Sequence, residues 1–155
     1  VVEVDVDGLP DSAGDWIESR IPAWTRRLTD AGLSGPDIDH CRTETARQIA
    51  NVLEDETGRW ILAGGSEAVA EFAVSGIVDG AIRSFRFDRA FAHGGERWII
   101  DYKTGQVDAG TQSLEQLVAR HRPQLDRYRA LAAELYGQPV RTALYLTALP
   151  RLIEV

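Results

Sequence analysis

Cysteine is nearly absent from the sequence, which contains Cys41 and no other. A disulfide framework, a zinc ribbon and an iron–sulfur cluster with four cysteine ligands all need more thiols than this. Any metal site built from this chain would therefore rely on oxygen ligands, with at most an imidazole added. We accordingly expect no iron–sulfur cluster.

Long apolar runs are also missing. No stretch approaches the roughly 20 apolar residues that cross a bilayer, and no basic segment followed by an apolar one opens the chain. We expect an intracellular, cytoplasmic protein. The sequence begins with Val1 rather than Met, and we expect it to be the C-terminal part of a longer chain.

Basic residues are outnumbered, because 17 Lys and Arg stand against 24 Asp and Glu, for a formal net charge of −7. An acidic surface does not attract phosphate backbones over long distances. This argues against a stand-alone binder of nucleic acids.

The rest of the composition is typical of one globular domain. With 155 residues, 44% hydrophobic and 26% charged, the chain differs from disordered sequences. A chain of this length buries roughly 70% of its unfolded surface. We expect a single domain over 1–155, with a helical segment over 1–58 and the core over 59–155.

Hydrophobic periodicity predicts the order of the elements. The period is helical over about 13–31 and 36–56, and it changes to two after Trp60. Three strands joined by glycine-containing turns come next, followed by a long helix and a last strand. Their approximate ranges are 68–75, 82–91 and 97–102 for the strands, 113–136 for the helix and 140–147 for the last strand. This order predicts an α/β fold with a small mixed sheet flanked by helices.

Three residues on neighbouring predicted strands are candidates for chemistry. Asp101 and Lys103 are two apart, so both side chains leave the same face of their strand. On the preceding strand, Asp88 is expected to share a half-polar face with Arg86, opposite Phe87 and Phe91. Two carboxylates brought together in this way repel each other, and a hard cation such as Mg²⁺ relieves the repulsion.

A lysine beside such a cation can orient the attacking water and offset charge in the transition state. The alternative interpretation is a solvated ion pair between Asp101 and Lys103 at a strand end. In the same way, Asp88 beside Arg89 is compatible with an ordinary surface salt bridge.

The motifs together resemble the PD-(D/E)XK nuclease domain of the RecB and AddA helicase–nucleases. They are FRFDRAF, then WIIDYKTG with Asp101 lying 13 positions after Asp88, then HRPQLDRY over 121–128. The resemblance covers roughly 58–155. It implies a restriction-endonuclease-like core in which Asp88 and Asp101 are metal ligands, Lys103 is the catalytic lysine and Glu71 is a supporting acid.

On the long helix, the resemblance implies that Gln124 and Tyr128 contact the lysine, water or the DNA strand. They are one turn apart and share a helical face. His121 stands where the family usually has Tyr, which is a departure from its pattern. Arg122 belongs to a group of arginines that either meets backbone phosphates or forms a solvated face.

Three other residues are further candidates for roles at the site, namely His40, His93 and Asp79. The family often has a histidine on an early helix that completes the metal site. Here the early candidate is His40, which we assign instead to a helix surface or core. His93 is interpreted as a turn residue. Asp79 competes with Asp88 for the second carboxylate, but its flanking glycines favour a turn.

The resemblance predicts a Mg²⁺- or Mn²⁺-dependent deoxyribonuclease, an exonuclease acting on single-stranded DNA ends. It also implies a superfamily 1 helicase in the same chain or complex, a role in double-strand-break processing and recombinational repair, and a location at the nucleoid. The alternative is a catalytically inactive module for DNA guiding or protein interaction. Because of the net charge, we expect the isolated chain to bind DNA weakly. Because the early histidine of the family pattern is missing, we expect the isolated chain to show little or no nuclease activity.

Overall fold

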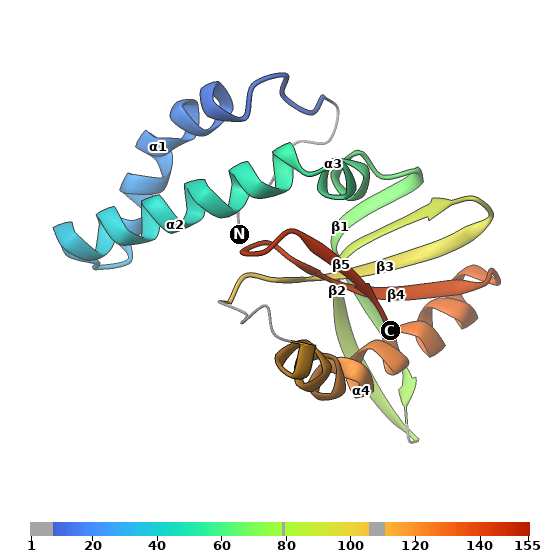
Figure 1. Ribbon diagram of the computed structural model, residues 1–155. Coiled ribbons are helices and arrows are strands. Elements are labelled where there is room, and N and C mark those ends of the chain that lie inside the picture. The colour runs from blue at the N-terminus through green and yellow to red at the C-terminus, as the bar shows by residue number, and fades with distance from the viewer. Residues whose placement is uncertain (1–7, 79, 106–110) are drawn as a thin grey trace.

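The structure is a computed structural model that describes residues 8–78, 80–105 and 111–155. Two long helices lie side by side at one end of the molecule, and a twisted sheet with a third long helix forms the rest (Figure 1). The helices are α1 (Ala13–Asp30), α2 (Gly35–Glu54), α3 (Glu56–Ala63) and α4 (Thr111–Tyr136). Within these residues, no helix is long and apolar enough to span a bilayer.

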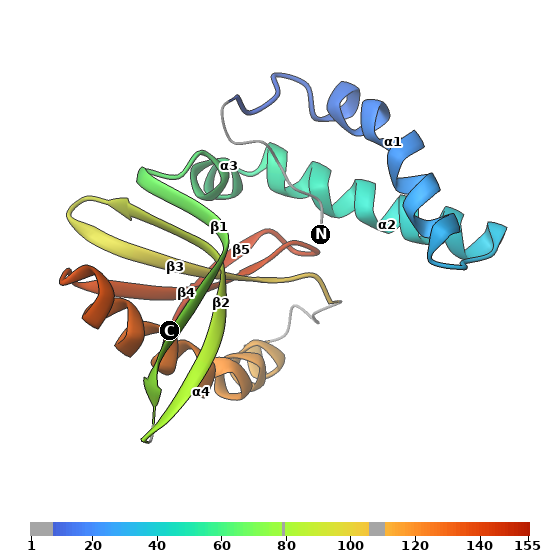
Figure 2. The ribbon, with the colours of Figure 1, turned by 180° about the vertical axis from the view of Figure 1, so that it is seen from behind.

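The sheet has five strands in the order β1-β2-β3-β4-β5. Their bounds are β1 (Ser66–Val78), β2 (Ala81–His93), β3 (Glu96–Lys103), β4 (Val140–Leu146) and β5 (Arg151–Glu154). The first three strands form an antiparallel meander, β4 runs parallel to β3, and β5 is antiparallel to β4. Because parallel neighbours need a crossover, α4 spans the sheet between β3 and β4, as Figure 2 shows from behind. The predicted α/β fold with a small mixed sheet is confirmed.

Each face of the sheet has its own hydrophobic core. On one face, Ile100 and Tyr145 pack with Leu53 of α2 and Ile61 of α3. On the other face, α4 lies against the sheet and buries a second set of side chains. This set includes Phe87, Ile99, Leu125, Tyr128 and Leu144. The sheet is therefore a middle layer between α2 and α3 on one side and α4 on the other.

The sequence predicts that side chains along β2 alternate regularly between the two faces of the sheet, and this prediction is wrong around Asp88. Phe87 packs against the α4 side, whereas Phe91 belongs to the core beneath α3. The two phenylalanines therefore lie on opposite faces, although their spacing of four residues predicts the same face for regular strands. The pairing of β2 with β3 begins only at Arg89 and Ile100, so the break in alternation falls where β2 leaves β3.

Helix α3 replaces the start of the predicted strand region. Asp55 caps it, because its side chain accepts a hydrogen bond from Gly58 N at 2.7 Å. The Tyr145 hydroxyl donates to the same carboxylate at 2.8 Å. Trp60 therefore belongs to a helix, and period-two structure begins at Ser66. The short strand β5 was also missing from the prediction.

Helix α2 is attached to the ends of β3 and β4 by polar side chains. Gln48 Nε2 donates to Thr104 O at 3.0 Å, and Gln48 Oε1 accepts from Thr147 Oγ1 at 2.6 Å. One turn later, Asn51 Nδ2 donates to the carbonyls of Thr147 and Ala148 at 3.1 and 3.3 Å. These bonds fix α2 over the edge of the sheet where the strands carrying the candidate residues end.

Candidate active site

Asp101 lies near the carboxyl end of β3, on the face that α4 covers. Its side chain is 6% exposed, and Oδ2 lies 2.6 Å from Lys103 Nζ. The other oxygen, Oδ1, accepts a hydrogen bond from Gln124 Nε2 at 3.2 Å. Apart from the ammonium contact, Oδ2 is buried without a hydrogen-bond partner among the described residues. A solvated ion pair at a strand end does not describe this arrangement, because the carboxylate is buried.

Asp88 lies on β2 beside the end of β3. The backbone ladder pairs Arg89 with Ile100, so Asp88 and Asp101 occupy the next positions on the two strands. Asp88 Oδ2 accepts a hydrogen bond from Tyr102 N at 2.9 Å. Burial raises the pKa of Asp88, and the charges of Asp101 and Glu71 raise it further, against the opposing effects of the Tyr102 N–H and Lys103. The charges of two other carboxylates thus act on Asp88, which is partly buried.

Glu71 lies on β1 and forms an ion pair with Arg86, with Oε2 3.3 Å from Nη1. Its backbone has a φ of 51°, a left-handed conformation that costs a non-glycine residue of order 1–3 kcal/mol. Its side chain is 39% exposed, so Glu71 is both solvent-facing and close enough to influence Asp88 electrostatically. The structure therefore brings Glu71 to the same region as Asp88.

Helix α4 contributes a hydrogen-bonded pair to the site. Gln124 Nε2 contacts Tyr128 OH at 2.6 Å as well as Asp101, and Tyr128 OH donates to Arg86 O at 3.0 Å. His121 lies one turn before Gln124. Partial burial and the charge of Lys103 lower the pKa of His121, while Asp101 acts in the opposite direction. The α4 side of Asp101 is thus formed by residues of the 121–128 motif.

The profile of the PD-(D/E)XK nuclease superfamily matches residues 9–152. The chain belongs to the PD-(D/E)XK nuclease superfamily. No curated protein matches the chain.

The carboxylates fit the divalent cations, such as Mg²⁺ or Mn²⁺, that PD-(D/E)XK nucleases typically use. Asp88 and Asp101 offer hard oxygen ligands, and Asp101 Oδ2 is a buried acceptor without a hydrogen bond. Mg²⁺ is commonly held by one or two carboxylates and keeps several waters. Among the residues that the structure describes, no group of three or more His, Cys, Asp or Glu is arranged around a metal position. Asp88 and Asp101 are the residues that would hold such a cation.

A cavity of about 900 Å³ lies between α2 and the sheet, next to Asp88. Asp88, Glu71 and Arg86 line it from the sheet, and His40 and Glu44 line it from α2. His40 is exposed on the helix surface, as predicted, yet it faces the same cavity as Asp88. Glu44 was not singled out from the sequence, because nothing in the α2 pattern distinguishes it from a solvated helical glutamate.

Arg89 does not form the salt bridge with Asp88 that their adjacency suggests. Its buried guanidinium donates instead to the carbonyls of Ile61 and Leu62, at 3.1 and 2.8 Å, near the end of α3. Burial lowers the pKa of Arg89. The carboxylate of Asp88 is therefore not neutralised by its neighbour in the sequence.

The remaining predicted residues lie elsewhere. Arg122 is exposed on α4 and lines a separate groove beside β5. His93 is exposed at the end of β2, with its ring against the edge of Trp60 at a centroid distance of 5.4 Å. Asp79 lies outside the described residues.

Proposed function

We propose that this PD-(D/E)XK domain is a metal-dependent deoxyribonuclease. The observation that carries the proposal is the grouping of Asp88, Asp101 and Lys103 where β2 and β3 diverge. It supplies two carboxylates and an ammonium group at one place, and Lys103 Nζ is held 2.6 Å from Asp101. The reaction is hydrolysis of a phosphodiester. Water adds its oxygen to phosphorus, the bond to the 3′ oxygen breaks, and a 5′-phosphate and a 3′-hydroxyl are left.

Each side chain has a distinct role in this reaction. Asp88 and Asp101 would hold a divalent cation, which when bound supplies Lewis-acid stabilisation of charge and a more acidic water. Lys103 orients the attacking water and offsets the negative charge that develops on the phosphoryl oxygens. The Lys103 side chain is 22% exposed, so it can reach a substrate while it stays paired with Asp101.

Gln124 and Tyr128 position Asp101 rather than react. Gln124 fixes Oδ1, and Tyr128 links Gln124 to the backbone of β2 through Arg86 O. Glu71 supports the site electrostatically, because its charge adds to that of Asp101 in raising the pKa of Asp88. Arg122 is proposed as a DNA contact outside the cavity.

At a finer level, we propose a RecB- or AddA-like exonuclease. It would act on single-stranded ends with Mg²⁺ or Mn²⁺, at the nucleoid, in double-strand-break processing and recombinational repair. A superfamily 1 helicase in the same chain or complex would deliver the strand. The net charge of −7 supports such a partner, since phosphate contacts by Lys and Arg supply most non-specific affinity for DNA.

A second candidate is a catalytically inactive module for DNA guiding or protein interaction. The observation in its favour is that no three potential metal-binding side chains converge among the described residues. The ion pair between the buried Asp101 carboxylate and Lys103 favours the first proposal, because a domain that only guides DNA does not need it.

The test is cleavage of single-stranded DNA in Mg²⁺ by the full enzyme and its Asp101→Ala and Lys103→Ala variants. We expect both variants to lose cleavage while folding and any ATP hydrolysis remain intact. Asp30→Asn, an exposed acid at the end of α1, is the matched control and should cleave normally. Wild-type nuclease rates in either active-site variant would refute the proposed roles.

A further inference from the structure

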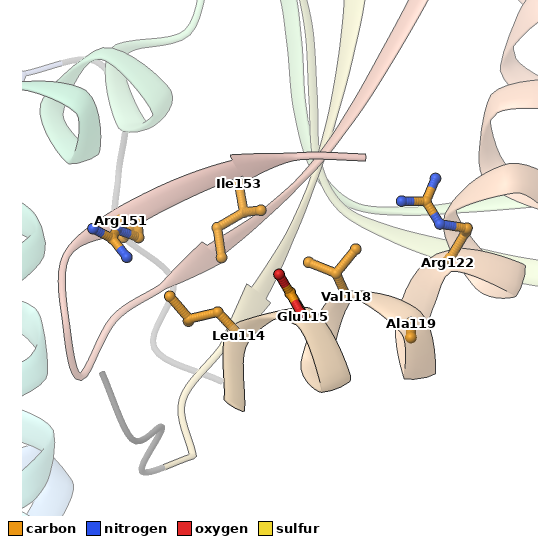
Figure 3. A pocket seen from close by; sticks show the side chains of 7 residues that line it. All are labelled: Leu114, Glu115, Val118, Ala119, Arg122, Arg151 and Ile153. Carbon is orange, nitrogen blue, oxygen red and sulfur yellow. The ribbon is translucent and has the colours of Figure 1, made fainter. Parts of the chain in front are cut away.

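A shallow groove of about 460 Å³ runs between α4 and the edge strand β5. Its floor is apolar, with Leu114 and Val118 from α4 and Ile153 from β5. Arg122 and Arg151 stand on opposite sides of these apolar side chains in the view of Figure 3. The groove thus combines an apolar floor with a cation toward each end.

Strand register connects this groove to the active site. Asp101 pairs with Leu144, which pairs with Ile153, and Lys103 pairs with Leu146, which pairs with Arg151. Directly paired residues lie on the same face of a sheet. Leu144 belongs to the core under α4, so both rows lie on the α4 side. Arg151 is therefore two strand spacings from Lys103, roughly 10 Å along the row.

Arg122 and Arg151 belong to the exposed arginines that are not paired with carboxylates in the described part of the chain, as do Arg26 and Arg83. Arg42, Arg47, Arg86, Arg129 and Arg141 form ion pairs with carboxylates. Within the part of the chain that the structure describes, neither Arg122 nor Arg151 forms an ion pair or a hydrogen bond, and both are exposed. Glu115 is the acidic residue among the side chains that line the groove. Unpaired guanidinium groups are suited to phosphate, which they bind in a bidentate manner.

We propose that this groove binds the nucleic-acid strand next to the scissile phosphodiester. Arg151 and Arg122 bind phosphates of that strand, and the apolar floor lies under its sugars and bases. This inference rests on the proposed nuclease function and adds a subsite to it. An acidic peptide would also suit two arginines and an apolar floor, but the position of Arg151 two strand spacings from Lys103 favours the strand that reaches the active site.

The test is the salt dependence of DNA binding. A fluorescein-labelled oligothymidylate is titrated with the chain in EDTA, which prevents cleavage, at several salt concentrations. The variants are Arg122→Ala, Arg151→Ala and the double variant, and Arg26→Ala on α1 is the matched exposed control. Each lost phosphate contact lowers the magnitude of the slope of log K against log salt by about 0.7 for a single strand.

We expect the double variant to lose about 1.4 from that slope and Arg26→Ala to lose nothing. In Mg²⁺, the double variant should show a KM raised roughly 3- to 30-fold, with kcat unchanged. A kcat that stays constant separates a binding role from damage to the fold.

Equal slopes for the wild type and the double variant would overturn the groove assignment, as would an equal loss for Arg26→Ala. Failure of the wild type to bind the oligonucleotide at low salt would also overturn it. If a labelled polyglutamate peptide loses binding to the double variant while the oligonucleotide does not, the groove docks protein and the assignment is wrong. The proposed function fails separately, if the wild type does not cleave saturating DNA in Mg²⁺ or Mn²⁺.

Discussion

Replacing Arg89 should show how the strand that carries Asp88 is held in place. The guanidinium is buried, since Arg89 is 3% exposed. It donates one hydrogen bond to Ile61 O at 3.1 Å and another to Leu62 O at 2.8 Å. These carbonyls lie in the last turn of α3, where no further helical N–H is available to them. Arg89→Met keeps much of the volume but removes both donors.

The expected loss follows from these two bonds. Hydrogen bonds from a charged group contribute about 1.5–3 kcal/mol each, and carbonyls left buried without partners add a penalty. Part of this loss is offset, because burying a methionine side chain costs less free energy than burying a charged guanidinium. The lowered pKa of Arg89 reflects that cost of burial. We expect Arg89→Met to lower the free energy of unfolding by about 2–4 kcal/mol. In a domain of this size, that corresponds to roughly 4–16 °C in Tm.

The measurement is thermal unfolding followed by far-UV circular dichroism. Arg83→Met is the matched control, because Arg83 lies exposed on the same strand and should change stability by no more than about 0.5 kcal/mol. Arg89→Lys keeps the charge and some donors, so its stability should fall between those of the wild type and Arg89→Met. A loss under about 1 kcal/mol in Arg89→Met, equal to that of the control, would refute the idea that Arg89 joins α3 to β2.

Two further predictions concern Asp88 and Gly65. Because the pKa of Asp88 is raised above 3.8, the folded state holds that proton more tightly than the unfolded state. This stabilisation is present below pH 3.8 and lost as the pH rises through the folded-state pKa. Asp88→Asn should therefore raise Tm in EDTA more at pH 7 than at pH 3.5, and a lower Tm at pH 7 would contradict this reasoning. At Gly65, an added Cβ would overlap the Ala92 carbonyl oxygen, so Gly65→Ala should lose about 1–3 kcal/mol in urea unfolding. In Gly14→Ala on α1, the added Cβ would lie 3.9 Å from Ser12 Oγ, an ordinary contact, so this variant should be neutral or stabilising by up to about 1 kcal/mol. Equal effects at the two glycines would disprove the close contact.

Elements with a long, regular pattern could be predicted from the sequence. Helix α1 was expected over 13–31 and spans Ala13–Asp30, and α4 was expected over 113–136 and spans Thr111–Tyr136. Many turns of one apolar stripe leave little ambiguity about such helices. Short elements carry too few residues for a period to emerge. Helix α3 has eight residues and β5 has four, and both were missed.

The neighbourhood of the site could be predicted only in part. The spacing of Asp101 and Lys103 predicts that they share a face, and the structure pairs them. The partners of Arg89 and the faces of β2 depend on tertiary contacts, which no local sequence pattern encodes. The partners of Arg89 lie 28 and 27 residues away in the sequence, so adjacency to Asp88 was a poor guide. The two sides of β2 around Asp88 could not be assigned either, because strand periodicity assumes a regular ladder.

The bonds that attach α2 to the ends of β3 and β4 have a consequence for the order of events during synthesis. Gln48 and Asn51 bind groups up to 99 residues later in the sequence, and Arg47 donates to Ala148 O, 101 residues later. A chain is synthesised at about 5–20 residues per second. The residues that bind α2 are therefore made roughly 5–20 s after α2 itself. Until these bonds form, α2 is not fixed beside the sheet, although it lines one side of the cavity next to Asp88. An emerging chain therefore contains Asp88, Asp101 and Lys103 before it contains the residues at the end of β4 that fix α2 beside Asp88.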